Sequence, residues 1–283
     1  MKMIKFFILG LVLGLTVQAQ ANEIVVKKMT GDLKQAPLDD AIWKSVKAQS
    51  VTLMAQPMIA PRPKTTATSK VDVRAVHNGE WVAFRFEWSD TEKSEAGAVG
   101  KFSDAVAVQF PVKEGAPPPV FMGAKDMPVH IFHWRAQYQK DKEKGKPDIK
   151  DIYPNMNPDM YPMDFPDSGN VKNLTPDKKE LYSHGQAAGN PQSYSKTGVD
   201  EIMAEGFGSS AIAGETHAIS SAVWNKNRWS VVIARPMKIE QGSSFTPGQS
   251  SFAGFAVWQG GQDEVGSRKS VTMSWTPVKF EKE

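Results

Sequence analysis

Two apolar stretches joined by an Asn-Gly pair constrain the fold more than any other feature of this sequence. Residues Lys70–His77 and Trp81–Trp88 flank Asn78-Gly79, a dipeptide typical of a tight hairpin turn in which both central residues have positive φ. Large apolar residues occupy every second position of the later stretch, so they share one face of a strand. The sequence therefore predicts an antiparallel hairpin within a larger sheet.

Other stretches with the composition of strands follow along the chain. They are Ala105–Phe110, Val129–Ala136, His217–Trp224, Arg228–Arg235, Phe252–Trp258 and Lys269–Trp275. Phe252–Trp258 is apolar on both faces, as expected of a central strand. Helical periodicity is confined to the short stretches Leu38–Val46 and Lys178–Ser183. Many short strands separated by Gly/Pro turns predict an all-β fold class, an antiparallel β-sandwich with few short helices.

The N-terminal residues have the pattern of a secretory signal peptide. Lys2 and Lys5 precede the apolar run Phe6–Val17, and Ala19-Gln20-Ala21 has the small-x-small pattern of a cleavage site. The run is shorter than the roughly 20 residues that span a bilayer; the alternative is a buried N-terminal helix. We expect residues 1–21 to be removed after Ala21 and residues 22–283 to form one periplasmic domain.

Composition excludes several classes of site. The 283 residues include no cysteine, which excludes disulfides, iron–sulfur clusters, thiol nucleophiles and the covalent attachment of a c-type haem. A net charge of +3 is too small to indicate nucleic-acid binding. Gly206-Phe207-Gly208 with Ala211 matches a dinucleotide-binding pattern but lacks its βαβ context. The pattern alone favours a binding or carrier module over an enzyme.

An insertion from about residue 140 to residue 191 interrupts the strand pattern. It is rich in Pro, Asp, Asn and Met, and proline recurs every four residues from Pro154 to Pro166, which opposes regular structure. Met156, Met160 and Met163 could bind copper(I) or pack the loop onto the domain. A loop this long is usually functional or a docking surface.

Lys269 is the residue most in need of explanation. In a strand over 269–275 it shares a face with Val271, Met273 and Trp275, so it points toward the core or its edge. Keeping a lysine neutral at pH 7 costs about 4–5 kcal/mol. A carboxylate partner, an exposed amine at the strand end, or coordination of a metal by the free amine would offset this cost.

Methionine and histidine are the other candidate metal ligands. Met122 and Met127 lie in a Pro/Gly-rich loop, and a thioether suits haem iron or copper. His130 and His133 are three residues apart, so on a strand they face opposite sides and cannot bind one ion together. The remaining histidines, His77, His184 and His217, are expected to be structural.

A series of phrases spanning Leu38 to Trp275 resembles a known family. The phrases are LDDAIWKSV, VDVRAVHNGEWVAFRFEWSD, FSDAVAVQFP, PPPVFMG, MPVHIFHW, AEGFGSS, NRWSVVIARPM, FAGFAVWQGG and RKSVTMSW. In this order they are similar to the haem b-binding γ subunits of type II molybdoenzymes of the DMSO reductase family. That group includes ethylbenzene dehydrogenase, dimethyl sulfide dehydrogenase, selenate reductase and chlorate reductase.

The resemblance implies a carbohydrate-binding-module-like cytochrome domain that binds one non-covalent haem b. The FMG phrase implies Met122 and the RKS phrase implies Lys269 as the axial ligands of the iron. Met127 is the rival methionine, and His130 or His133 could replace a ligand. The insertion after Asp151 matches the family only loosely, so no role is inferred for its residues.

The function implied by the resemblance is electron transfer without catalysis. The chain would relay electrons between the iron–sulfur clusters of a periplasmic molybdopterin oxidoreductase complex and an external cytochrome or quinone-linked carrier. Its partners would be a molybdopterin-containing catalytic subunit and an iron–sulfur subunit, and the catalytic subunit would determine the substrate and the direction of electron flow. The alternatives are a periplasmic carbohydrate-binding module, a Met-rich copper(I)-binding protein and an unassigned enzyme.

Overall fold

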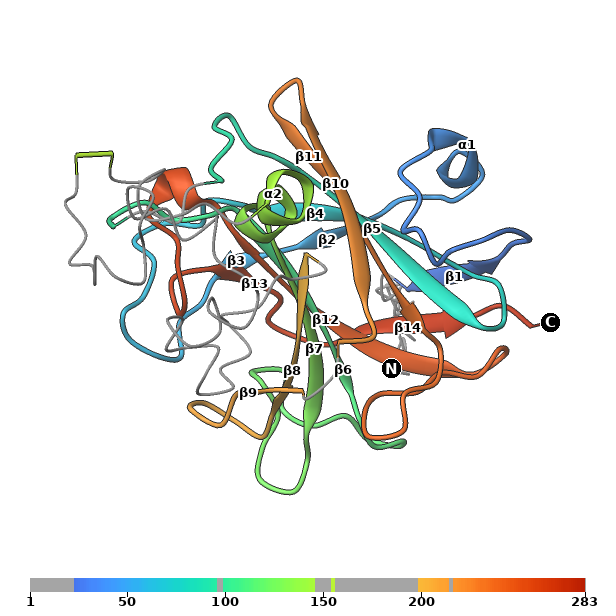
Figure 1. Ribbon diagram of the computed structural model, residues 1–283. Coiled ribbons are helices and arrows are strands. Elements are labelled where there is room, and N and C mark those ends of the chain that lie inside the picture. The colour runs from blue at the N-terminus through green and yellow to red at the C-terminus, as the bar shows by residue number, and fades with distance from the viewer. Residues whose placement is uncertain (1–22, 96–98, 146–153, 156–197, 214–215, 283) are drawn as a thin grey trace, which may run out of the picture.

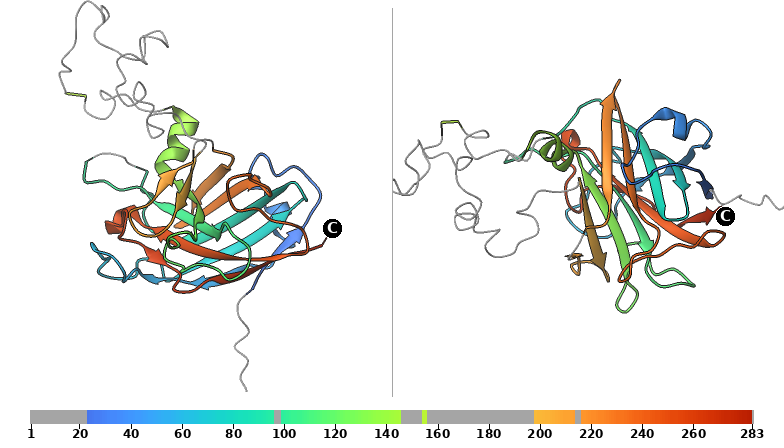
Figure 2. Two further views of the ribbon diagram at one scale, coloured as in Figure 1. Left: turned by 90° about the horizontal axis from the view of Figure 1, so that it is seen from below. Right: turned by 45° about the vertical axis from the view of Figure 1, so that its right-hand side comes forward.

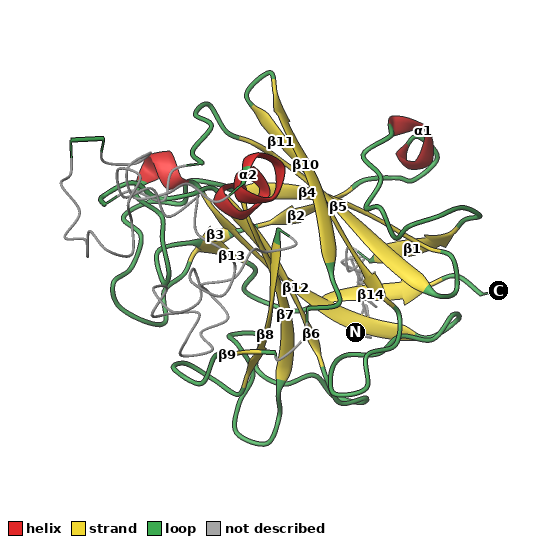
Figure 3. Cartoon of the chain, in the orientation of Figure 1, coloured by secondary structure: helices red, strands yellow, loops and turns green. Residues whose placement is uncertain are grey.

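The computed structural model describes residues 23–95, 99–145, 154–155, 198–213 and 216–282. Strands make up most of the regular structure (Figure 3). The expected signal peptide, the helix expected over Lys178–Ser183, His184 and the methionines 156, 160 and 163 lie outside the described residues. No helix in the described ranges has the length and apolarity needed to cross a bilayer.

Within the described ranges the elements follow one another as strands with three short helices (Figure 1). They are β1 (Ile24–Lys28), α1 (Asp40–Trp43), β2 (Gln49–Thr52), β3 (Met54–Ala55), β4 (Lys70–His77), β5 (Trp81–Ser89), β6 (Ala105–Pro111), β7 (Val129–Arg135), α2 (Ala136–Lys144), β8 (Val199–Ala204), β9 (Ala211–Ile212), β10 (Ile219–Asn225), β11 (Arg228–Pro236), β12 (Ser250–Trp258), the 3-10 helix η3 (Gly260–Gln262), β13 (Ser270–Val271) and β14 (Thr276–Phe280).

The strands form a sheet in the order β10-β11-β5-β4-β1-β14-β12-β6-β7-β8-β9, with β13 also beside β12, β3 beside β13, and β2 beside β4. Strand β12 belongs to both halves: Ser250–Ala253 pair with β14, and Gly254–Trp258 pair with β6. The two halves pack face to face as the layers of a sandwich, seen from two further directions in Figure 2. The predicted all-β sandwich class is confirmed. Its purely antiparallel pairing is wrong, because β1 runs parallel to both β4 and β14.

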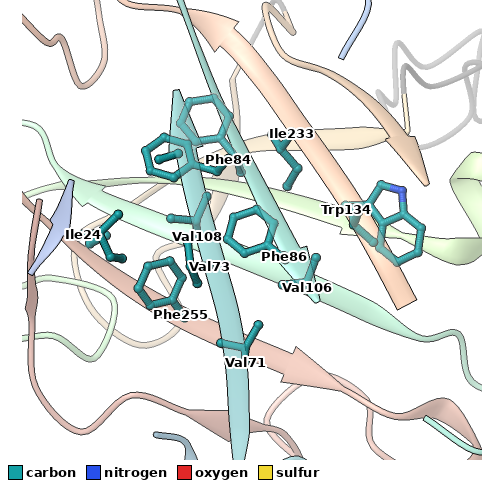
Figure 4. Close-up of a cluster of buried hydrophobic side chains, with 14 of the residues drawn as sticks. Ile24, Val71, Val73, Phe84, Phe86, Val106, Val108, Trp134, Ile233 and Phe255 are labelled. Carbon is teal, nitrogen blue, oxygen red and sulfur yellow. The ribbon is translucent and has the colours of Figure 1, made fainter. Parts of the chain in front are cut away.

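A single large core fills the space between the layers (Figure 4). Phe84 and Phe86 of β5 meet Val106 and Val108 of β6, and Phe255 of β12 lies 6.1 Å from Phe86 between ring centroids. These side chains are at most 3% exposed. Fully burying a side chain of this size contributes about 1.5–3 kcal/mol, so the core stabilises the sheet halves against each other.

The predicted hairpin forms, but its turn differs from the prediction. Strands β4 and β5 pair antiparallel as far as His77 and Val82. Gly79 has positive φ while Asn78 does not, so this is not a turn with two left-handed residues. Instead, the Asn78 side chain accepts hydrogen bonds from the main-chain N–H groups of Glu80 and Trp81. A side-chain oxygen therefore stabilises the turn.

The strand predicted over Lys269–Trp275 is wrong beyond its first residues. β13 covers only Ser270–Val271, the chain bends at Met273 and Ser274, and β14 begins at Thr276. Met273 is 41% exposed, so the alternation that placed it inward fails at the bend. Helix α2 was also not predicted, and it extends into the charged start of the expected insertion.

Candidate functional site

Small side chains form the floor of a pocket on the outer face of the β12-β6-β7 half. Gly254 and Ala256 of β12 pair with Gln109 and Ala107 of β6, and Ala107 in turn pairs with His133 of β7. Directly paired residues share a face of the sheet, so these positions lie side by side. Their small side chains leave space above the sheet where larger residues would fill it.

Four loops raise the walls of this pocket around a volume of about 330 Å³. They contribute Gln56 and Ile59; Val120, Phe121 and Met122; Phe207, Gly208 and Ser210; and Gly266, Ser267 and Lys269. The volume falls at the lower end of the range of about 300–1,000 Å³ typical of ligand pockets. Apolar side chains predominate in the lining, and Lys269 is the one lysine or arginine that the described residues contribute to it.

Met122 and Lys269 both line this pocket, although they are far apart in the sequence. The Lys269 amine lies 4.9 Å from the centroid of the Trp258 ring. In the described part of the chain no carboxylate forms an ion pair with Lys269. Among these residues, therefore, the cost of burying Lys269 is not offset by a carboxylate partner.

Burial lowers the pKa of the Lys269 amine to about 8. Burial destabilises the charged amine, so the uncharged form is easier to reach at neutral pH than it is for a lysine in water. The pocket therefore favours a lysine that can present a free amine.

Met122 lies in a turn with a left-handed backbone, at φ 65°. Its carbonyl accepts a hydrogen bond from the Gly206 N–H at 2.8 Å, and the Gln109 side chain donates to the Val120 carbonyl. Met127, the rival methionine, is 38% exposed and is absent from the pocket lining. The structure brings Met122, and not Met127, into the same space as Lys269.

The two histidines of β7 separate as the spacing predicts. His130 faces the core, where its Nε2 lies 2.9 Å from Glu201 Oε1 and its Nδ1 accepts from the Ser243 N–H. His133 lines the pocket, its ring centroid 4.7 Å from that of Trp258. Among the described residues the buried Nε2 of His133 has no hydrogen-bond partner. Burial lowers the pKa of His133 well below its usual value, so the ring is neutral.

The other two described histidines do not line the pocket. His77 lies in the core, with its ring centroid 6.0 Å from that of Phe280. The main-chain N–H of His217 donates to Glu201 at 2.7 Å. Within the described ranges no three His, Asp or Glu side chains gather as they would around a metal ion.

Glu264 fixes the loop that carries Lys269. Its carboxylate accepts from the Gln259 N–H at 2.9 Å, and the Ser270 hydroxyl lies 3.4 Å away. Burial raises the pKa of Glu264 to about 7. The loop is thereby tied to the end of β12, immediately beside Trp258.

This pocket suits a flat, largely apolar group that contains a metal. Its floor of small side chains leaves room for such a group, and most of its lining is apolar. Met122 supplies a thioether, a soft ligand, and Lys269 supplies an amine without an ion pair. Among the described residues the buried Nε2 of His133 has no hydrogen-bond partner, so this nitrogen is available to a bound group.

Sequence analysis did not identify the floor or two of the walls. Gly254, Ala107 and Ala256 carry no individual signal, because small residues also occur in ordinary sheets. Phe207 and Gly208, considered only as part of a dinucleotide pattern, follow β8 and line the pocket instead. The one available signal was the unusual run of small residues in strands that are otherwise rich in large apolar ones.

Known proteins are similar to this chain over most of its length. A family model described as ethylbenzene dehydrogenase matches residues 40–270, a range that includes Met122 and Lys269. The chain is 26% identical to chlorate reductase subunit gamma of Ideonella dechloratans, over 94% of this chain and 88% of that one. It is 27% identical to the ORF7 product of Haloferax mediterranei, named as a candidate respiratory nitrate reductase heme subunit, over 89% of this chain and 71% of that one.

Among solved structures, the chain is similar to a family 9 carbohydrate-binding module of Caldicellulosiruptor kristjanssonii in complex with glucose. The TM-score is 0.44 at 8% identity, covering 92% of this chain and 96% of that one.

Proposed function

Because the chain belongs to the ethylbenzene dehydrogenase family, we propose that it is the haem b electron-transfer subunit of a molybdopterin oxidoreductase complex. The observation that carries this proposal is the shared pocket of Met122 and Lys269. The chain performs no catalysis of its own in this proposal. The substrate is converted in another subunit.

Met122 and Lys269 would hold the iron of one non-covalent haem from two different loops of the pocket. A haem iron that is fully ligated by the porphyrin and the protein would exchange single electrons and would offer no open position to a small molecule. Two residues of this chain would adapt the iron to single-electron transfer. Met122 favours the reduced state, as thioether ligands do, and the desolvated Lys269 presents an amine that is easily deprotonated.

The names of the two relatives support the assembly with other subunits, since both are named as subunits of reductases. We propose a molybdopterin-containing catalytic subunit and an iron–sulfur subunit as the partners of this chain. An external cytochrome or quinone-linked carrier would be the other end of the electron path. We also propose that the chain is exported to the periplasm and that residues 1–21 are removed.

The pocket opening is the face proposed for the iron–sulfur subunit. Ile59 and Phe207, which line the pocket, are 39% and 44% exposed, and the neighbouring Met58 is 51% exposed. Permanent subunit contacts are more apolar than those of transient electron carriers. An apolar rim around a cofactor pocket therefore suits a stable partner whose cluster must come close to the haem.

The decisive experiment is the absorption spectrum of the purified full chain, produced with haem available. We expect a Soret band, sharp α and β bands on reduction, and one haem per chain by pyridine haemochrome assay. A colourless protein that binds cello-oligosaccharides would support the carbohydrate-binding alternative. A colourless protein that binds copper(I), and loses it when the methionines 156, 160 and 163 are replaced, would support the copper alternative.

A further inference from the structure

Trp258 fixes the loop that carries Lys269. Its indole Nε1–H donates to the Gly266 carbonyl at 3.0 Å, three residues before the lysine. The face of the same indole lies 4.9 Å from the Lys269 amine. His133 packs against the ring at 4.7 Å between centroids and an interplanar angle of 31°. The indole is 7% exposed, so its orientation is determined by these contacts.

Trp275 has the equivalent relationship to the loop that carries Met122. Its Nε1–H donates to the Pro118 carbonyl at 2.5 Å. Pro118 opens the turn in which the Gly123 N–H donates to the Pro119 carbonyl and the Met122 N–H to the Val120 carbonyl. The Trp275 side chain also packs in the apolar cluster that contains Met122.

We propose that these two tryptophans are positioning residues, Trp258 for Lys269 and Trp275 for Met122. The inference rests on the proposed function, because it concerns how the two haem ligands are held. Both indoles would act through the loops that carry the ligands, and neither would contact the iron itself. Each would restrict an irregular loop so that one ligand atom meets the metal at bonding distance.

The energetic reason lies in the indole N–H group. Trp258 is buried and Trp275 is half-buried. An indole N–H that is shielded from water and left without an acceptor carries a desolvation cost, so each bond to a loop carbonyl is retained. Loops are otherwise the most mobile parts of a fold, and groups that orient ligands have large effects on metal sites. Each indole N–H binds one main-chain carbonyl of a ligand loop and so restricts the movement of that loop.

One short segment connects the two restraints. Lys269 and Trp275 begin and end the stretch that contains β13, and β13 pairs with β12 through Val271–Ala256 and Ser270–Val257. Trp258 is the last residue of β12. The lysine directly precedes this strand pair, the indole that holds the lysine loop ends β12, and the indole that holds the methionine loop follows β13 after the bend at Met273 and Ser274.

The test replaces each indole with phenylalanine, which keeps a ring and removes the N–H. Trp224→Phe is the matched control, because the Trp224 N–H also donates to a main-chain carbonyl, that of Asp90 at 3.1 Å, and Trp224 does not line the pocket. The measurements on the haem-loaded full chain are the reduction potential and the rate at which cyanide binds the ferric form.

The two variants should shift the potential in opposite directions. Loosening the thioether in Trp275→Phe should lower the potential, because a thioether favours ferrous iron. Loosening the amine in Trp258→Phe should raise it, because a hard nitrogen donor favours ferric iron. Cyanide should bind about fivefold faster in both, the change expected when a hydrogen bond of ordinary net strength is lost, and Trp224→Phe should match the unaltered chain.

Two outcomes are separable. An unaltered chain that binds no haem overturns the proposed function and this inference with it. An unaltered chain that binds haem, with variants whose potentials stay the same or move together, overturns the inference alone. If a phenylalanine variant does not fold, site-specific incorporation of benzothienylalanine, which has the shape of tryptophan and lacks the N–H, gives the same comparison.

Discussion

His130 and His133 lie three residues apart on β7 and face opposite sides of the sheet. His130 lies against Glu201 in the core, and both side chains are 1% exposed. His133 lines the pocket with a buried nitrogen that has no partner among the described residues. One strand therefore separates a structural histidine from one that faces the site.

This separation predicts different consequences for the two histidines. His130→Ala should lower the free energy of unfolding by about 3 kcal/mol, because it leaves the Glu201 carboxylate buried with one partner fewer. The haem content of the folded fraction should not change. His133→Ala should weaken haem binding more than folding. Urea denaturation and haem stoichiometry distinguish the two; loss of haem in His130→Ala at unaltered stability would contradict the assignment.

Removal of the amine should change the spin state of the haem. Lys269→Ala is expected to lose haem or to retain it in a high-spin form, because one axial position is left without a protein ligand. Lys125→Ala, near Met122 in the sequence but outside the pocket lining, is the control and should keep the spectrum of the unaltered chain. Electron paramagnetic resonance of the ferric protein gives the answer. A low-spin signal unchanged in Lys269→Ala would refute this ligand.

The two methionines of the Pro/Gly-rich loop should behave differently. Met122→Ala is expected to abolish the near-infrared band that reports a thioether bond to ferric iron, and to lower the reduction potential. Met127→Ala should do neither, because Met127 is 38% exposed and outside the lining. Redox titration with absorption spectroscopy makes the comparison, and the reverse pattern would move the ligand to Met127.

A charge at the pocket opening should disrupt assembly with the iron–sulfur subunit. Phe207→Glu buries a carboxylate in an apolar contact, so we expect at least a tenfold loss of affinity, corresponding to about 1.4 kcal/mol. Val223→Glu on β10, at a residue that is 46% exposed and absent from the pocket lining, is the control. Co-expression with the identified partner subunits, followed by quantification of each in the purified complex, provides the measurement. Equal assembly of both variants would place the interface elsewhere.

Stability should fall as the pH rises from about 4 to 7. Burial, and then the nearby Asp104 carboxylate, raise the pKa of Asp90 from 3.8 to about 7. Between these two pKa values the folded protein holds a proton on Asp90 that the unfolded chain has released. The stabilisation that this proton provides is therefore full at low pH and is lost as the pH passes 7.

Asp90→Asn removes this titration. The variant should be more stable than the unaltered chain by about 1–2 kcal/mol at pH 8 and equal to it at pH 4. Comparison of urea midpoints at the two pH values isolates Asp90 from the other titrating groups. A difference between the two proteins that is the same at both pH values would exclude the mechanism.

Much of the fold follows from local patterns. Strands β4, β5, β6, β7, β11 and β12 were predicted because their side chains alternate or form apolar runs. β8 was not, since it contains Asp200 and Glu201, both buried. Their burial depends on groups from distant segments, such as His130 for Glu201. No local window of sequence contains those partners.

The site was predicted less directly than the fold. Alternation indicated that Lys269 points inward, and the structure places it in the pocket, although the strand that motivated the argument ends at Val271. Met122 was selected by resemblance, because a methionine in a loop has no pattern of its own. The small residues of the floor and the two indole bonds depend on strand register and loop closure, which only the folded chain defines.

The position of β1 determines when this sheet can be completed. Its residues hydrogen-bond to β4 on one side and to β14 on the other. Both edges of residues 24–28 can therefore be paired only after residues 276–280 have been synthesised. During synthesis the early part of the chain therefore has an open strand edge, and the barrier to folding includes closing a loop that spans nearly the whole domain. A chain made in this order keeps one edge of β1 unpaired until β14 has left the ribosome, so the sheet closes only at the end of synthesis.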